Sequence, residues 1–263
     1  MWKKWINNNV LTVQDHGRVR VLTFSRPKQL NAMNDLLYDA VAEGLVRAQA
    51  DSKIAAVILT GEGRAFCAGQ DLAELASRPK YPSGERHGFQ PFIEAVATFA
   101  KPLIAAVNGL GVGIGLTILP YCDRVIMDEG ASLRAPFVSL GVTAEAGSTF
   151  MLARMIGANH AANVLLTGRW VYAGHAREIG LANEVAPAGK ALEQALKYAD
   201  AFQNAPVASL VATKSLLVEA RLEAGRDARR HEYVLFHQLE GAPANLEALA
   251  AFREKRQPDF SRH

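Results

Sequence analysis

Strand patterns alternate with helical patterns through the first two thirds of this chain of 263 residues. Residues 17–24 are β-rich and alternating, residues 34–50 have helical spacing, and the apolar runs at 54–61 and 103–109 predict buried strands. A strand that is apolar throughout has to be covered on both faces, and helices between parallel strands provide that cover. The pattern therefore predicts an α/β core with parallel pairing.

The strand patterns stop after about Pro187, and helical patterns follow at 191–204, at 207–223 and on towards Arg256. We therefore expect a core at residues 1–190 and an all-helical region at residues 191–263. The helical region is expected to pack on the core or on a neighbouring subunit.

Two further stretches lie between the strand patterns. Residues 77–88 are rich in proline, glycine and charge, which predicts an exposed loop. Apolar residues then recur at helical spacing, which favours a stripe that faces the core over a ligand-binding surface. The stripe consists of Phe89, Phe92, Ile93, Val96 and Phe99.

Composition excludes several classes of protein. The 29 Lys and Arg residues nearly balance the 26 Asp and Glu residues, so the charge gives no indication of nucleic-acid or membrane binding. The two cysteines, Cys67 and Cys122, lie in apolar or glycine-rich stretches and are expected inside the protein. The N-terminus lacks the apolar run of a signal peptide, and no apolar run approaches the roughly 18 residues of a membrane span. We expect a soluble cytoplasmic protein.

The glycine-rich segment 109–115 follows a predicted strand and opens a predicted helix, as in dinucleotide-binding proteins. Its spacing does not fit that class, because G-x-G-x-x-G would need glycine at Ile114 or at Leu116. A Walker-type phosphate loop is also excluded, since no Gly-Lys-Ser/Thr follows. What remains is a strand-to-helix turn with free backbone N–H groups.

A second glycine turn, at residues 65–72, also follows a predicted strand and also opens a predicted helix. If the two turns face each other, one N–H from each could hold the oxygen of a thioester as it becomes an enolate. The alternative is two ordinary glycine turns that let helices pack closely.

Five segments together resemble the enoyl-CoA hydratase/isomerase, or crotonase, family in order and spacing. They are Arg26–Asn34, Ala65–Leu72, Lys101–Gly115, Leu166–Val185 and Pro206–Leu217. The resemblance covers nearly the whole chain and is closest to the peroxisomal-type 3,2-enoyl-CoA isomerases. It implies a crotonase-like spiral of ββα units, with a helical C-terminal region that mediates trimerisation and covers the active site.

The resemblance implies that the backbone N–H groups of Gln70 and Ile114 form an oxyanion hole. Hydratases of the family usually have glycine at the second position, whereas several isomerases carry a bulkier apolar residue there. We interpret Asp71 as a helix N-cap and not as a catalytic acid. The residues implied to bind the CoA part of the substrate are Lys28, Leu30, Ala68, Gly69, Gln70, Asp71 and Leu72.

The resemblance also places the two carboxylates of a hydratase at positions that here hold Thr117 and Phe137. Neither side chain can accept a proton near neutral pH, so hydration by two carboxylates is not expected. The nearby Glu145, which follows Ala144, resembles the catalytic glutamate of the isomerases, although their preceding residue is proline. A single base suffices to move a proton from C2 of a 3-enoyl thioester to C4, and an apolar setting would raise its pKa.

The expected function is therefore isomerisation of 3-enoyl-CoA to 2-enoyl-CoA in fatty acid metabolism. Three alternatives stay open: an enoyl-CoA hydratase, a ring-epoxide acyl-CoA isomerase, whose enzymes carry aspartate where Glu145 stands, and a non-catalytic acyl-CoA-binding protein. We expect no metal, no cofactor other than the CoA of the substrate, and a homotrimer or hexamer.

Overall fold

The structure, a computed structural model, describes residues 9–71 and 88–261. The strands are β1 (Leu11–His16), β2 (Val19–Phe24), β3 (Ala56–Gly61), β4 (Ala65–Cys67), β5 (Leu103–Val107), β6 (Leu110–Val112), β7 (Arg124–Asp128), β8 (Ser132–Arg134), β9 (Val171–Tyr172) and β10 (Glu184–Ala186). The α-helices are α1 (Asp35–Ala50), α3 (Phe89–Thr98), α4 (Ile114–Thr117), α5 (Ser148–Ile156), α6 (Ala158–Thr167), α7 (Ala173–Glu178), α8 (Ala191–Ala199), α9 (Val207–Leu239) and α10 (Pro243–Glu254). The 3-10 helices are η2 (Pro27–Gln29), η3 (Leu119–Tyr121), η4 (Val138–Leu140) and η5 (Asp200–Phe202).

The larger sheet has the strand order β1-β2-β3-β5-β7-β10. Strands β1 and β2 form an antiparallel hairpin, and every other neighbouring pair in this sheet is parallel. The predicted parallel α/β core is therefore confirmed. The strand predicted at 17–24 begins at Val19, because Gly17, with φ of 60°, makes the hairpin turn.

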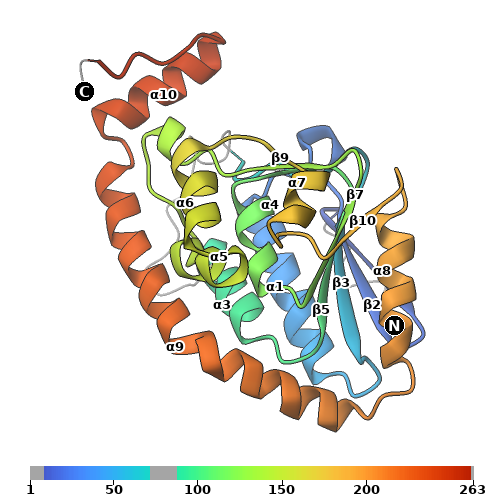
Figure 1. Ribbon diagram of the computed structural model, residues 1–263. Coiled ribbons are helices and arrows are strands. Elements are labelled where there is room, and N and C mark those ends of the chain that lie inside the picture. The colour runs from blue at the N-terminus through green and yellow to red at the C-terminus, as the bar shows by residue number, and fades with distance from the viewer. Residues whose placement is uncertain (1–8, 72–87, 262–263) are drawn as a thin grey trace.

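Helices cover both faces of this sheet, as Figure 1 shows. Alternate residues of β3 point to opposite sides: Val57 and Leu59 join the core beneath α1 and α3, whereas Ala56 and Ile58 join the core beneath α8. Helix α8 contacts the sheet through alanines spaced four apart, Ala191, Ala195 and Ala199. Helix α8 is thus part of the sheet packing, and the division of the chain at residue 190 stays a prediction.

A smaller sheet, with the order β4-β6-β8-β9, contains the starts of both glycine segments. Strands β4 and β6 pair in parallel, with Ala65 opposite Leu110 and Cys67 opposite Gly111. Sequence periodicity did not predict these strands, because three residues are too few to show an alternation. A Cβ on Gly109 would lie 2.2 Å from the Arg64 carbonyl oxygen, so only glycine allows the approach. The pairing brings the ends of the two segments side by side.

The helical predictions agree with the structure where it describes them. Helix α1 begins directly after Asn34, whose side-chain oxygen accepts a hydrogen bond of 3.0 Å from the Leu37 N–H. In the predicted stripe around α3, Phe92, Ile93, Val96 and Phe99 are buried, and Phe89 is half-buried. Both cysteines are buried and free. The predicted loop at 77–88 lies outside the described residues, apart from Gly88.

The C-terminal region is helical, as predicted, and Figure 1 shows α9 running along the outer edge of the molecule to α10. Helix α9 extends without a break over 33 residues and joins the pattern predicted at 207–223 to part of the pattern that follows it. Glu94 of α3 pairs with Arg229 of α9 at 2.9 Å and so ties α9 to the core. Among the described residues, every helix is too short or too polar to span a lipid bilayer.

Lys101 supplies a test of the packing where the chain enters β3 and β5, the two central strands of the larger sheet. Its buried ammonium donates hydrogen bonds of 2.7, 2.7 and 2.9 Å to the carbonyls of Ala48, Asp51 and Ile54, where α1 ends and the chain approaches β3. Lys101→Met removes the ammonium from the buried carbonyls of Ala48 and Ile54, whereas the Asp51 carbonyl still accepts from the Ile54 N–H at 3.1 Å. The variant is expected to lower the free energy of unfolding by about 3 kcal/mol. Urea denaturation measures the change.

The matched control is Lys53→Met, at an exposed lysine in the loop between α1 and β3 that also carries the Asp51 and Ile54 carbonyls. That variant is expected to change stability by less than about 0.5 kcal/mol. Equal effects of the two substitutions would show that the three hydrogen bonds of Lys101 do not stabilise the fold.

Candidate active site

The residues predicted to bind CoA come together in the structure. The turn η2 carries the exposed Lys28, and Leu30 follows it with a left-handed φ of 52°. The Ala68 N–H donates to the Leu30 carbonyl at 3.0 Å, and the Met33 N–H donates to the Gly69 carbonyl at 2.7 Å. Residues 28–33 and 68–71 therefore form one surface from two segments.

Asp71 forms an ion pair with Arg26 at 2.8 Å. The ion pair joins the segment that ends at Asp71 to the residues just before η2. The helix that Asp71 was predicted to cap would begin beyond it, at residues that the structure does not describe. Leu72, the last of the predicted CoA-binding residues, also lies outside the described residues.

Two backbone N–H groups are left without acceptors where the glycine segments meet. Within the described part of the chain, neither the Gln70 N–H nor the Ile114 N–H donates a hydrogen bond. Ile114 is the first residue of α4, so its N–H has no acceptor within that helix. Each amide is thus available to a ligand.

The glycines of the two segments lie against each other. A Cβ on Gly113 would be 3.8 Å from the Gly69 Cα, and a Cβ on Gly115 would be 2.4 Å from the Cys67 carbonyl oxygen. Glycine is therefore required at residue 115, because any side chain there would push α4 away from residues 67–69. This close approach places the residues that follow, Gln70 and Ile114, at neighbouring positions.

The Gln70 side chain is held away from its own amide. The Tyr38 hydroxyl of α1 donates to the Gln70 Oε1 at 3.1 Å, and the Tyr38 ring packs in the core between α1 and α3. Since this contact fixes the side chain, it also limits rotation of the backbone that carries the N–H.

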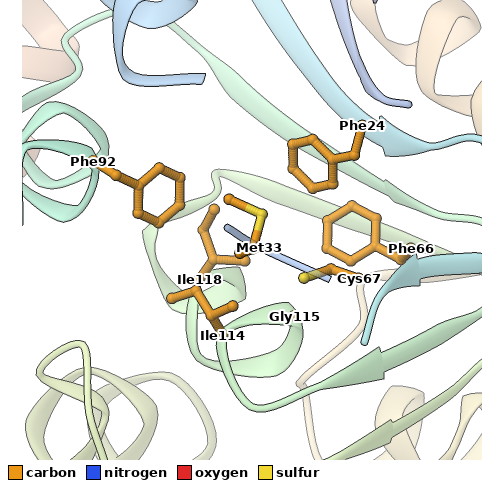
Figure 2. Close-up of a pocket in the computed structure, with 8 residues that line it drawn as sticks. All are labelled: Phe24, Met33, Phe66, Cys67, Phe92, Ile114, Gly115 and Ile118. Carbon is orange, nitrogen blue, oxygen red and sulfur yellow. The ribbon is translucent and has the colours of Figure 1, made fainter. Parts of the chain in front are cut away.

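An apolar wall includes Ile114, which carries one of the two amides, and Figure 2 shows the side chains that form it. Three aromatic rings, Phe24, Phe66 and Phe92, face Ile114 and Ile118 of the segment that starts with α4. The gap between these described side chains is too narrow for a water molecule. The wall would offer hydrocarbon contacts and no polar group to an acyl chain.

Glu145 lies in the turn before α5 and is half-buried. Within the described residues its carboxylate makes no hydrogen bond or ion pair. Its charge contributes to a raised pKa of the Cys67 thiol, about 12, which results mainly from burial. Because Cys67 belongs to the same wall as Ile114, the Glu145 carboxyl lies within electrostatic reach of the two-amide region.

The turn that carries Glu145 is strained and is held by two other side chains. Ala146 has a φ of 64°, an unfavourable conformation for a residue with a Cβ. The Tyr121 hydroxyl donates to the Ala146 carbonyl at 2.5 Å, and the Glu232 carboxylate of α9 accepts from the Gly147 N–H at 2.5 Å. The sequence did not point to Tyr121 or Glu232, because each is distant along the chain and belongs to no recognised motif.

Burial raises the pKa of Glu145 from its ordinary value of 4.5 to about 7, and the negative charge of Glu232 adds to the effect. The residue as a whole is half-buried, and most of the surroundings of its carboxyl are protein. A carboxyl with a pKa near 7 can both accept and return a proton at neutral pH.

The two positions that correspond to the hydratase carboxylates are both buried. Phe137 contributes to the core, and the fully buried Thr117 hydroxyl has no hydrogen-bond partner among the described residues. Glu145 is therefore the acidic side chain that the described structure brings to this site. No group of three or more potential metal ligands occurs within residues 9–71 and 88–261.

The spiral of strands and helices, with paired free amides beside an apolar wall, defines an α/β protein of the crotonase class. A family model described as enoyl-CoA hydratase/isomerase matches residues 14–263, which is nearly the whole chain. The chain therefore belongs to the enoyl-CoA hydratase/isomerase family.

Individual relatives agree with this assignment. The 2,3-dehydroadipyl-CoA hydratase of Escherichia coli (strain K12) is 34% identical, over 95% of this chain and 98% of that protein. The 1,2-epoxyphenylacetyl-CoA isomerase of the same organism is 31% identical, over 92% of this chain and 95% of its own length. The crystal structure of an enoyl-CoA hydratase/isomerase from Pseudoalteromonas atlantica T6c matches with a TM-score of 0.91 and 34% identity, and covers 96% of this chain and 100% of that one. The predicted crotonase-like fold is confirmed.

The raised pKa of Glu145 predicts a pH-dependent stability that needs no substrate to observe. The native state binds this proton more tightly than the unfolded chain, so its contribution to stability is present below pH 4.5 and is lost as the pH rises to about 7. Glu145→Gln removes the titration and is expected to be more stable than the wild type at pH 8 by on the order of 1 to 3 kcal/mol. The difference should nearly vanish at pH 4.

Thermal unfolding of both proteins from pH 4 to pH 8 measures this difference. A stability difference that stays constant with pH would mean that Glu145 titrates normally, and hence that its carboxyl is well solvated.

Proposed function

We propose that the protein isomerises 3-enoyl-CoA thioesters to 2-enoyl-CoA thioesters, with Glu145 as the proton carrier. The observation that carries this proposal is a half-buried carboxyl with a raised pKa near two unpaired backbone amides. The thioester oxygen would accept hydrogen bonds from the Gln70 and Ile114 N–H groups. Glu145 would take a proton from C2 to give a dienolate and return it to C4, which leaves the double bond between C2 and C3.

The same residues argue against efficient hydration. Adding water across a double bond requires one group to activate the water and another to manage the proton at C2. The hydroxyl of Thr117 and the ring of Phe137 provide neither. Similarity to the E. coli hydratase does not by itself assign hydration to this chain, because the 1,2-epoxyphenylacetyl-CoA isomerase of that organism is similar to nearly the same degree.

A ring-epoxide acyl-CoA substrate is a second candidate. The relative named 1,2-epoxyphenylacetyl-CoA isomerase aligns with 92% of this chain, and its reaction also requires no water. Glutamate at residue 145 favours the 3-enoyl substrate, since the resemblance to the family associates aspartate at this position with the ring-epoxide enzymes.

Substrate binding is proposed to use the surface made by residues 28–33 and 68–71. The exposed Lys28 provides a cation for the phosphates of CoA, and the thioester end would reach the two amides. CoA would enter as part of the substrate, and we propose no further cofactor.

Glu145→Gln tests the proposed role most simply. With 3-hexenoyl-CoA as substrate, the wild type should form the 2-enoyl product, and the variant should lose about 100- to 10,000-fold in kcat because it cannot carry the proton. Glu219→Gln, at an exposed glutamate of α9, is the matched control and should retain wild-type activity. The absorbance of the conjugated thioester follows the reaction.

Crotonyl-CoA and an epoxide of phenylacetyl-CoA serve as competing substrates in the same assay. Water addition to crotonyl-CoA at a rate comparable with isomerisation would overturn the proposal, as would faster turnover of the epoxide. Binding of acyl-CoA without any turnover would favour a non-catalytic acyl-CoA-binding protein.

We also propose a homotrimer or a hexamer. Large apolar side chains are exposed along α9 and α10, including Leu216, Leu217, Leu246 and Phe252 with exposed fractions of 55–68%. A second copy of the chain would bury them and gain the corresponding hydrophobic free energy. Sedimentation velocity should give a mass of three or six chains, and a monomer at micromolar concentration would contradict this proposal.

A further inference from the structure

A second carboxylate, from a distant part of the chain, binds the turn that follows the proposed base. Glu232 of α9 is buried, with 5% of its surface exposed. It accepts hydrogen bonds from the Gly147 N–H at 2.5 Å, the Thr149 N–H at 2.9 Å and the Thr149 hydroxyl at 2.6 Å. These donors belong to the turn and the first helical residues that follow Glu145.

We infer that Glu232 is a positioning residue: its carboxylate fixes the turn that carries Glu145 and keeps a negative charge beside the proposed base. The inference rests on the proposed role of Glu145 as the proton carrier. Glu232 itself exchanges no proton with substrate, and acts only through residues 145–149.

The hydrogen bonds favour the ionised form of Glu232 more than that of Glu145. Glu232 accepts from three donors, whereas no described residue donates to the Glu145 carboxylate. Burial raises the pKa of Glu232, but these donors and the nearby guanidinium of Arg229 oppose that effect. Of two neighbouring carboxyls, the better hydrogen-bonded one ionises first, and its charge then raises the pKa of the other.

Other charged and titratable groups around this pair come from the elements packed against it. Arg229 of α9 donates towards the Tyr121 hydroxyl at 3.4 Å and pairs with Glu94 of α3. On the other side, Cys67 of β4 stays protonated, because burial raises its pKa to about 12. Glu232 is thus the neighbouring carboxylate whose negative charge acts on Glu145. Arg229 is held by its ion pair with Glu94.

The strained turn at residues 146–147 depends on α9, because α9 supplies one of the side chains that hold it. Ala146 and Gly147 both have positive φ, so the turn needs fixed partners to persist. The Tyr121 hydroxyl binds the Ala146 carbonyl, and the Glu232 carboxylate binds the next N–H. If Glu232 is shortened or neutralised, one of these two supports is weakened.

A direct titration of the Glu145 carboxyl tests the inference without any substrate. Carbon NMR of protein labelled at glutamate carboxyls, with Glu145 assigned from Glu145→Gln, gives its midpoint in each variant. Glu232→Gln removes the charge at nearly constant size, and the Glu145 midpoint should fall from about 7 by about one unit. Thr149→Val removes one donor to Glu232 but leaves its charge, and should leave the midpoint near 7.

Glu232→Asp separates charge from positioning and guards against a glutamine variant that does not fold. Aspartate keeps the negative charge but is too short to reach both N–H groups, so the midpoint should stay raised while kcat for 3-hexenoyl-CoA falls about tenfold. In Glu232→Gln the acid limb of kcat/KM should move to lower pH together with the NMR midpoint, because the base ionises more easily.

Two results would overturn the inference: an unchanged Glu145 midpoint in Glu232→Gln, or an equal fall in Thr149→Val. If the midpoint moves as expected but no variant isomerises 3-hexenoyl-CoA, Glu232 still controls Glu145 and the proposed function alone fails.

Discussion

The close approach of the backbone at Gly69 and Gly113, with Gly115 against Cys67, is the constraint on which the rest of the site depends. Parallel pairing of β4 with β6 brings the two segments together, and the absence of side chains at the glycines allows contact between main chains. The approach leaves two N–H groups at the ends of short strands with no acceptor among the described residues. Unpaired donors in a largely buried setting have a free-energy cost, and a thioester oxygen in the same place would relieve it.

Stability of the fold and proton transfer place opposite requirements on the Glu145 carboxyl. A carboxylate would normally be solvated or paired, yet this one is half-buried, receives no hydrogen bond from any residue that the structure describes, and lies near a second acidic side chain. The fold tolerates this because the neighbouring turn is held by Tyr121 from the segment after α4 and by Glu232 from α9. Segments from three regions of the chain are therefore needed to keep a single acid in a state that is unfavourable for stability and useful for proton transfer.

Much of this arrangement could be predicted from the sequence, for identifiable reasons. The buried strand at 54–61 is a continuous apolar run, and the amphipathic helix after Asn34 has clear helical periodicity. The glycine segments mark the turns that carry Gln70 and Ile114. The strands β4 and β6 could not be predicted, because three residues give no period. Glu232 could not be predicted either, since its role depends on how a 33-residue helix lies against the α5 turn, which local patterns do not determine.

The proposed function depends on one step, the formation of an enolate at C2 of a bound thioester, with Glu145 as the group that removes the proton. The most direct measurement is exchange of the C2 hydrogens of a saturated acyl-CoA with D2O, followed by proton NMR. If Glu145 removes the proton, the C2 hydrogens exchange with the wild-type protein and do not exchange with Glu145→Gln. Equal exchange rates with both proteins would contradict it, because another group would then be removing the proton.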